Sequence, residues 1–450
     1  MNKWDFYKRL FLLSLPIALQ SFLMSSLSFA DTIMVGKLGE VSLAAVGVAN
    51  QIFIFINFLF FGISSGVGTF LAQYYGREEW NKVRKVTSYG FLLTIAVALV
   101  FGLFTFLFPS LVMRVFSKDE AVIREGIKYL RVVALSYIAP GLTLVLSTAF
   151  RTQKRAHIPL IITLTAGSLN IFLNWVFIYG NLGSAKFGAT GAAMATAISR
   201  TVEIISLILI TYCSRRNGKL VYKFAFFGRD MHYGPIFVKN FYKISMPIIL
   251  NETFWAIGNI LYKVAFSLLG TGALAAMNIT ESITNFFVIA MMAISNASLV
   301  LLGGTLGKGD IEGATKESHY VLIASAIMGT ILALFEILLA PFFASLFNIS
   351  AEVQQSAINA MRVYALAIPF RTVAVCIIVG ILRSGGDTTA AFLLESLTLY
   401  FIGLPIAFVL AGVFKVSIEF VYFAILVEAV VKMLLCFWRM HTKKWLKIIN

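Results

Sequence analysis

Seven acidic side chains interrupt stretches of sequence that are otherwise apolar. A carboxylate inside a membrane-spanning helix costs roughly 2–3 kcal/mol or more, so such a residue is a candidate functional site. A cavity lined by carboxylates can accept protons, sodium ions or an organic cation. Basic side chains are expected to be nearly absent from the same stretches. The seven candidates are Asp31, Glu203, Glu252, Glu281, Glu336, Glu395 and Glu428.

Solvation at the end of an apolar stretch is the alternative for each of these acids. Their positions favour solvation for Glu336 and Glu428 and leave Glu203 and Glu281 open between the two interpretations. Asp31 and Glu252 lie further inside their stretches, so the functional interpretation is stronger for them.

Asp31 shares its candidate chemistry with two asparagines. It lies about four helical turns beyond Pro16, a residue that removes one backbone hydrogen bond and allows a helix to bend. Asn170 and Asn174 are four residues apart and therefore share one helical face. Amide oxygens can bind sodium or accept a hydrogen bond from a protonated carboxyl group. The alternative is that the asparagines only join helices by hydrogen bonds.

The composition indicates that these residues lie in a membrane protein. Charged residues make up 13% of the 450 residues, against roughly 25% in soluble domains, and the mean hydropathy is +0.87. Apolar stretches long enough to cross the hydrocarbon core recur, and helices satisfy their own backbone in lipid. We expect an all-α integral membrane protein with twelve spans, near residues 11–36, 42–71, 87–110, 127–150, 158–180, 189–211, 241–267, 273–302, 319–346, 359–382, 388–411 and 416–438.

The second half of the chain repeats the first with an offset of about 231 residues. Pro16 aligns with Pro247 and, after a one-residue slip, Arg151 aligns with Arg383. Weak internal repeats in an apolar chain are typical of transporters, whose substrate sites lie between the repeats. The repeat predicts an N-terminal six-helix lobe (1–211), a cytoplasmic connection (212–240), a C-terminal six-helix lobe (241–438) and a basic cytoplasmic tail (439–450).

The net charge of +16 follows the positive-inside rule. Basic residues of alternate connections outnumber those of the opposite loops roughly four to one, which predicts cytoplasmic termini and a multi-pass protein of the cell inner (plasma) membrane. No single face concentrates the charge, so nucleic acid is not an expected partner. The three cysteines lack metal spacing, and no nucleotide-binding or hydrolase motif occurs, so neither an enzyme nor an ATP-driven pump is expected.

Several strings in the sequence are similar to those of one transporter family. "FADTIMVGKLGEVSLAAVG", "LNIFLNWVFIYG", "GATGAAMATAISR" and "LRSGGDT" resemble the multidrug and toxic compound extrusion (MATE) family. The resemblance covers residues 6–447. It implies twelve helices in two six-helix lobes related by a pseudo-two-fold axis along the membrane normal. It also implies a secondary active antiporter that exports cationic, lipophilic compounds in exchange for protons or sodium.

The resemblance also assigns roles to residues of the N-terminal half. Asp31 matches the family's first-helix aspartate, which implies cation coupling, and Asn170, Asn174 and Thr196 fall on positions of the same site. If the coupling ion is sodium, Asp31, Asn170 and Asn174 are its expected ligands. No cofactor is expected besides the coupling proton or sodium.

The C-terminal half departs from the family pattern. Trp255 and Thr372 stand where some members carry acids, whereas Glu252 substitutes in part and Glu395 resembles an acidic position of the eleventh helix. We expect Glu252, Trp255 and Glu395 to contact substrate, and Pro16 and Pro247 to act as hinges of alternating access.

Two other functions compete with multidrug efflux. A lipid-linked oligosaccharide flippase of the same wider superfamily would need cavity arginines for an anionic lipid, and a membrane-embedded lipid-modifying enzyme would need a polar catalytic cluster near the interface. The expected partners are small organic cations and membrane lipids, and one chain contains both lobes, so a monomer suffices.

Overall fold

The structure is a computed structural model that describes residues 2–216, 219–220, 233–347 and 349–449. In this part of the chain the elements are helices, apart from one hairpin in which β1 (Arg215–Arg216) pairs antiparallel with β2 (Lys219–Leu220). Residues 217–218 and 221–232 of the predicted connection 212–240 lie outside the described residues. The predicted all-α fold class is confirmed.

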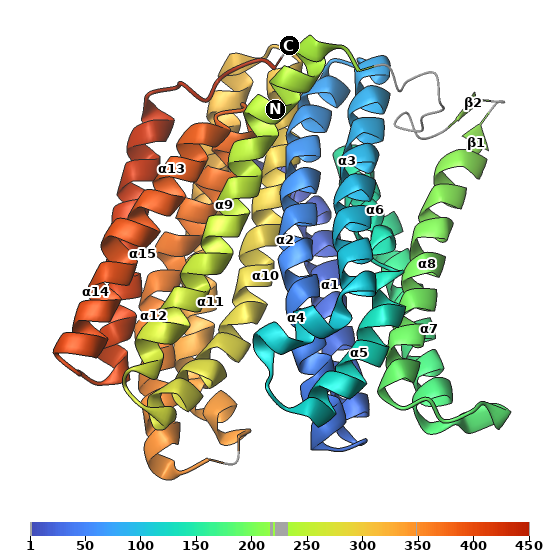
Figure 1. Ribbon diagram of the computed structural model, residues 1–450. Coiled ribbons are helices and arrows are strands. Elements are labelled where there is room, and N and C mark those ends of the chain that lie inside the picture. The colour runs from blue at the N-terminus through green and yellow to red at the C-terminus, as the bar shows by residue number, and fades with distance from the viewer. Residues whose placement is uncertain (1, 217–218, 221–232, 348, 450) are drawn as a thin grey trace. The chain divides into compact units, whose positions relative to one another are not determined.

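Eleven helices of the described residues are long and apolar enough to cross a membrane (Figure 1). A twelfth span results when α5 (Glu120–Ala134) and α6 (Ile138–Thr152), which meet at 46°, are taken together. The twelve predicted spans are therefore confirmed. The eleven are α1 (Lys3–Gly36), α2 (Glu40–Gly76), α3 (Trp80–Leu107), α7 (His157–Tyr179), α8 (Ala189–Cys213), α9 (Pro235–Ser267), α10 (Thr271–Gly307), α11 (Ile311–Ser345), α12 with η3 (Ala351–Leu382), α13 to η5 (Thr388–Val413) and α15 (Ile418–His441).

Shorter segments complete the helices. The span Thr388–Val413 is composed of α13 (Thr388–Thr398), the π-helix η4 (Leu399–Gly403), α14 (Leu404–Phe408) and the π-helix η5 (Val409–Val413). The span before it combines α12 (Ala351–Val375) with the π-helix η3 (Cys376–Leu382). Outside the spans, α4 (Pro109–Phe116) begins with a proline, which is tolerated there because an N–H in the first turn has no partner within the helix. The short helix η1 (Asn181–Gly183) follows α7.

The chain divides into two compact units that are not contiguous in sequence. We call Leu19–Leu71 with Glu78–Lys239 the N-terminal unit. The C-terminal unit comprises Met1–Ala18, Ala72–Arg77 and Asn240–Asn450. Helices α1 and α2 therefore each contribute to both units, and the division within α1 falls two residues beyond Pro16. The predicted lobe boundaries at 211 and 240 stay a prediction.

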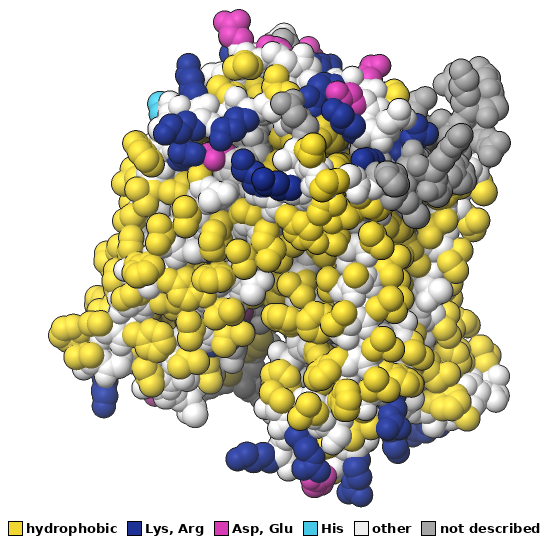
Figure 2. Space-filling model, turned by 45° about the horizontal axis from the view of Figure 1, so that its top comes forward, with side chains coloured by type: hydrophobic (Ala, Val, Ile, Leu, Met, Phe, Trp, Pro, Cys, Tyr) yellow, Lys and Arg dark blue, Asp and Glu magenta, His cyan; other side chains and the backbone are white. Residues whose placement is uncertain are grey.

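Each unit has its own apolar core, and apolar side chains also cover its outside. Ile56, Phe60 and Tyr137 are fully buried in the N-terminal unit, whereas α10 and α12 supply much of the core of the C-terminal unit. Large side chains such as Leu338 and Phe401 are about three-quarters exposed, at 75% and 74%. On the face in Figure 2, apolar side chains cover the sides of the helices, and Lys and Arg gather at their ends. This is the surface that lipid tails and headgroups require.

The basic end of the chain packs on the C-terminal unit. Trp445 is 1% exposed, and its indole N–H donates to the carbonyl of Met440 over 3.2 Å. The side chain of Gln73, near the end of α2, donates to the carbonyl of Lys447 over 3.0 Å and accepts from the N–H of Ile449 over 2.7 Å. One buried amide therefore pairs with both a carbonyl and an N–H group of the final backbone segment.

Candidate functional site

The four residues predicted to couple a cation lie together in the N-terminal unit. Asn174 is fully buried on α7, and its Nδ2 donates to Asp31 Oδ1 of α1. The same nitrogen lies 3.4 Å from Asn170 Oδ1, and Asn170 Nδ2 lies 3.5 Å from Thr196 Oγ1 of α8. The spacing of four residues on α7 thus places both amides on the face that meets α1 and α8. Asp31 is half-buried, with an amide as its hydrogen-bond donor.

A small polar cavity adjoins this cluster. Asp31, Asn170 and Thr196 line it together with Arg200 and Glu203, and its volume is about 20 Å³. That volume holds about one water molecule, and the lining supplies the two to four polar partners that a buried water needs. In this conformation the cavity can accept a water or a small ion, and it is far smaller than the pockets of several hundred Å³ that hold drug-sized ligands.

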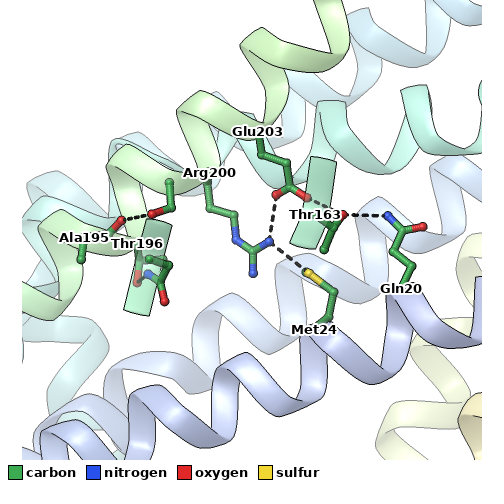
Figure 3. A network of polar contacts seen from close by, with 9 residues as sticks. Gln20, Met24, Thr163, Ala195, Thr196, Arg200 and Glu203 are labelled. Carbon is green, nitrogen blue, oxygen red and sulfur yellow. Dashed lines mark hydrogen bonds and ion pairs between the residues drawn. The ribbon is translucent and has the colours of Figure 1, made fainter. Parts of the chain in front are cut away.

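Arg200 and Glu203 form an ion pair (Figure 3). Both residues line the same cavity as Asp31. They are three residues apart on α8, and Arg200 Nη1 lies 3.0 Å from Glu203 Oε2. The same nitrogen contacts the sulfur of Met24 on α1 over 3.2 Å. Glu203 is 1% exposed, whereas Arg200 is 21% exposed. Glu203 is therefore a buried, paired acid, which settles the choice that its position in the sequence left open.

A chain of hydrogen bonds extends from Glu203 to the far end of α6. Thr163 donates to Glu203 Oε1 over 2.7 Å and accepts from Gln20 Nε2 over 3.1 Å (Figure 3). Gln20 Oε1 in turn accepts from Arg151 Nη2 over 2.7 Å. Three helices and the last turn of α6 are thereby joined through polar side chains, which removes the cost of burying each alone.

Three buried acids of the C-terminal unit have basic partners. Glu252 Oε1 on α9 lies 2.8 Å from Arg383 Nη2, and Arg383 is 1% exposed. Lys432 Nζ on α15 lies 2.6 Å from Glu395 Oε1 and 2.7 Å from Glu428 Oε1. Tyr262 donates to the other oxygen of Glu428 over 2.6 Å.

These pairs correct three expectations. The expectation that basic residues are nearly absent from the spans is wrong, because Arg200, Arg383 and Lys432 lie within helices of the spans or at their ends. Arg383, which lies just beyond the predicted span 359–382, is buried against Glu252. Solvation of Glu336 and Glu428 is also wrong, since these side chains are 0% and 4% exposed. Helical spacing could have indicated two of the pairs, Arg200 with Glu203 and Glu428 with Lys432.

The remaining predicted residues lie on the helices as follows. Glu281 pairs with Lys263 over 2.8 Å near the surface. Trp255 is half-buried, nearly one turn beyond Glu252 on α9. Thr372 is buried on α12 and donates to its own helix. The predicted hinges Pro16 and Pro247 lie within α1 and α9.

Comparisons with known proteins agree with this architecture. The family model described as MatE matches residues 16–176 and 247–409, one match in each repeat. A "Probable multidrug resistance protein NorM" of Mannheimia succiniciproducens is 25% identical, covering 98% of this chain and 96% of that protein. An "Uncharacterized transporter YisQ" of Bacillus subtilis is 24% identical, covering 97% and 95%.

Solved structures share the fold. A crystal structure of MATE in the bent conformation superposes with a TM-score of 0.89 at 20% identity, covering 98% of this chain and 96% of that one. An outward-facing multidrug resistance MATE family transporter gives 0.88 at 20% identity, covering 97% and 96%.

Proposed function

The chain belongs to the MatE family of membrane transporters, and we propose that it is a secondary active multidrug efflux transporter. In this proposal it exchanges cationic, lipophilic compounds for a coupling cation, a proton or sodium, by alternating access. The multidrug resistance proteins named among its relatives support the substrate class. The excess of basic residues in alternate connections supports cytoplasmic termini in the plasma membrane. The family is one of transporters, so the chain is not an enzyme.

One observation carries the proposal: Asp31 meets Asn170, Asn174 and Thr196 at a water-sized cavity. A carboxylate that is held by an amide, with an open cavity beside it, can accept a mobile cation. Asn174 suits both states of Asp31, because an amide offers an N–H to the carboxylate and, after a flip, an oxygen to the protonated acid.

Antiport requires that cation and substrate favour different conformations. We propose that cation uptake at Asp31 stabilises one conformation and that substrate stabilises the other. Pro16 and Pro247 support bending of α1 and α9, because each leaves a carbonyl of its own helix without its usual N–H. The division of the units close to Pro16 is consistent with a hinge there.

Substrate recognition is proposed for the C-terminal unit at Glu252, Trp255 and Glu395. The acids are already neutralised, so a cationic substrate has to displace Arg383 from Glu252 or Lys432 from Glu395. Trp255 offers a flat, half-buried ring near Glu252 for stacking and cation–π contact. When a substrate cation replaces the side chain of Arg383 or Lys432 beside its acid, the net charge of the pair does not change. This limits the electrostatic cost of the exchange.

Uptake of the cationic dye ethidium into inverted membrane vesicles tests the proposal. With an acid-inside or a sodium-inside gradient, wild-type vesicles should accumulate the dye. Asp31→Asn should lower this uptake about tenfold or more at normal expression, because the amide cannot exchange a charge. Asp5→Asn is the matched control, since Asp5 lies on the same helix and is exposed. Full uptake by Asp31→Asn would remove Asp31 from the mechanism.

A further inference from the structure

A second cavity lies at one end of the C-terminal unit, between the first turns of α11 and the tail that follows α15. Its volume is about 270 Å³, against about 20 Å³ for the cavity beside Asp31, and ligand pockets begin at roughly 300 Å³. One part of its lining, which we call the apolar wall, consists of Met440, Trp445 and Leu446. Another part, the basic rim, consists of the exposed residues His319, His441 and Lys443.

The apolar wall is held in place by contacts within the same unit. Trp445 and Met440 are 1% and 4% exposed, and the indole N–H of one donates to the carbonyl of the other. The backbone of Trp445 lies against Gly385, where a Cβ atom would approach the Trp445 carbonyl oxygen to 1.5 Å. Lys443 takes the left-handed conformation, with a φ of 55°, directly after the end of α15. The tail is therefore a fixed wall of the cavity.

The two histidines of the basic rim each have one ring nitrogen left for a ligand. His319 Nδ1 lies 2.7 Å from the carbonyl of Thr315. His441 Nδ1 lies 3.0 Å from the carbonyl of Phe437. Because a carbonyl can only accept, each Nδ1 is the donor, and Nε2 has no hydrogen-bond partner among the described residues. A proton on Nε2 makes each ring a cation that can donate to an anion.

The positive charge of the basic rim is not balanced by nearby acids. Residues 439–450 contain neither Asp nor Glu, and none of the described residues that line the cavity is acidic. On α11 the neighbouring Glu317 is buried and accepts from Thr305 over 2.8 Å. Lys443 has no ion-pair partner in the part of the chain that the structure describes. The rim therefore attracts a negatively charged ligand.

The length of α11 places the cavity at the level of the lipid headgroups. The helix has 35 residues, about 52 Å at 1.5 Å per residue, whereas the hydrocarbon core is roughly 30 Å thick. If the surplus is shared between both ends, about 11 Å of helix extends beyond the core at each. His319 lies about 12 Å from the start of α11, close to this boundary. Apolar chains and ionic headgroups of lipids meet at this level.

We propose that this cavity binds an anionic phospholipid, whose phosphate contacts the basic rim and whose adjoining apolar part lies against the apolar wall. Basic pockets beside transmembrane helices are suited to such headgroups. A lipid fits better than a free phosphate, because the apolar wall cannot replace the hydration of an ion. The inference concerns a site apart from the Asp31 cavity, and it does not depend on the proposed transport function.

The positive-inside rule is the competing explanation for the charges. It accounts for basic residues at this end of the helices without any lipid site. In that case Lys443 and its neighbours Lys444 and Lys447 should attract anionic lipid equally. A site predicts a difference, because Lys443 lines the cavity and the other two lysines do not. All three are exposed, so their positions relative to the cavity distinguish the two explanations.

Lipid binding to the full-length protein in detergent, measured by native mass spectrometry, tests the inference. The wild type should bind dioleoylphosphatidylglycerol about tenfold or more tighter than dioleoylphosphatidylcholine. His319→Gln combined with Lys443→Gln should weaken binding of the anionic lipid about tenfold or more, because the rim loses two of its cationic groups. Lys444→Gln combined with Lys447→Gln is the matched control. It removes two charges of the same tail outside the cavity and should change the affinity less than about twofold.

The other outcomes overturn the inference. Equal losses in the two double variants would assign the attraction to the charge of the whole helix end. Equal affinity for both lipids would exclude recognition of an anionic headgroup. Displacement of the lipid by equal concentrations of glycerol 3-phosphate would make the ligand a free phosphate.

A measurement on the wild type covers the case in which the rim variant does not fold. Dioleoylphosphatidylglycerol should protect Lys443, but not Lys444, from acetylation by acetic anhydride, as read by peptide mass spectrometry. Equal acetylation of both lysines would overturn the site. Ethidium uptake is a separate measurement, so failure of the lipid site leaves the proposed function intact.

Discussion

The two units place polar residues at matching positions of the repeat but give them different charges. With the offset of about 231 residues, or one more after the slip, Thr163 corresponds to Glu395, Arg200 to Lys432 and Arg151 to Arg383. In the N-terminal unit Arg200 faces one anchoring carboxylate, Glu203. In the C-terminal unit Lys432 lies between two, Glu395 and Glu428. Both units therefore hold a base at one repeat position, half-buried in the case of Arg200 and buried in the case of Lys432, and surround it differently.

The position of Asp31 shows what this difference means for function. Its counterpart in the second repeat is Tyr262, whose hydroxyl donates to Glu428. The N-terminal unit thus keeps a carboxylate that is held by an amide and adjoins a cavity, whereas Glu252, Glu395 and Glu428 of the C-terminal unit are each paired with a base. A carboxylate without a base is available to a mobile cation, whereas one that is paired with a base becomes available only when that base is displaced. The helices of the two repeats correspond, but we expect cation exchange only in the N-terminal unit.

The largest effect is expected from Lys432→Met. The substitution leaves Glu395 and Glu428 buried without their shared base, and breaking a buried ion pair costs about 3–5 kcal/mol. Thermal unfolding of the purified protein in detergent should show a markedly lower midpoint. Lys263→Met is the control, because its pair with Glu281 is 44% and 36% exposed, and such pairs contribute about 0–1 kcal/mol. Equal stability of both variants would break the contrast between the units.

Hydropathy and local spacing were sufficient to predict single helices and the residues that share one helical face. The twelve spans followed from apolar length, and Asn170 with Asn174 followed from their spacing on one helix. The pairing of Glu252 with Arg383 could not be predicted, because 131 residues separate them and the contact depends on tertiary packing. Arg383 lies next to the "SGGDT" turn, just beyond the predicted span 359–382, and its long side chain reaches back into the protein.

The compact units include a feature that the repeat alone does not indicate. The internal repeat predicts lobe boundaries near residues 211 and 240, which stay a prediction. Contacts group the start of α1 and the end of α2 with the C-terminal unit, where Gln73 binds the last residues of the chain. A continuous helix gives no local signal of such a division, apart from Pro16 close to the boundary in α1.

An intermediate effect is expected from Thr163→Val, which tests the anchor of Arg200. The substitution keeps the shape but removes the donor to Glu203 and the acceptor for Gln20, and an unsatisfied buried polar group costs about 1–3 kcal/mol. The unfolding midpoint should fall by less than in Lys432→Met. Thr165→Val is the control, since Thr165 lies on the same helix and is exposed. A variant with wild-type stability would show that Thr163 does not support the pair.

The smallest effect is expected from Glu336→Gln in the C-terminal unit. Glu336 is 0% exposed, and neither of its oxygens has a partner among the described residues. No ion pair is lost on substitution, so the free energy of unfolding should change by less than about 1 kcal/mol, in contrast to Lys432→Met. Gradient-driven uptake of ethidium should also persist, because Glu336 does not line the Asp31 cavity. Loss of uptake with unchanged stability would place a second exchanging carboxylate in the C-terminal unit. Cation exchange would then belong to both copies of the repeat, and the asymmetry argued from Asp31 and Tyr262 would be wrong.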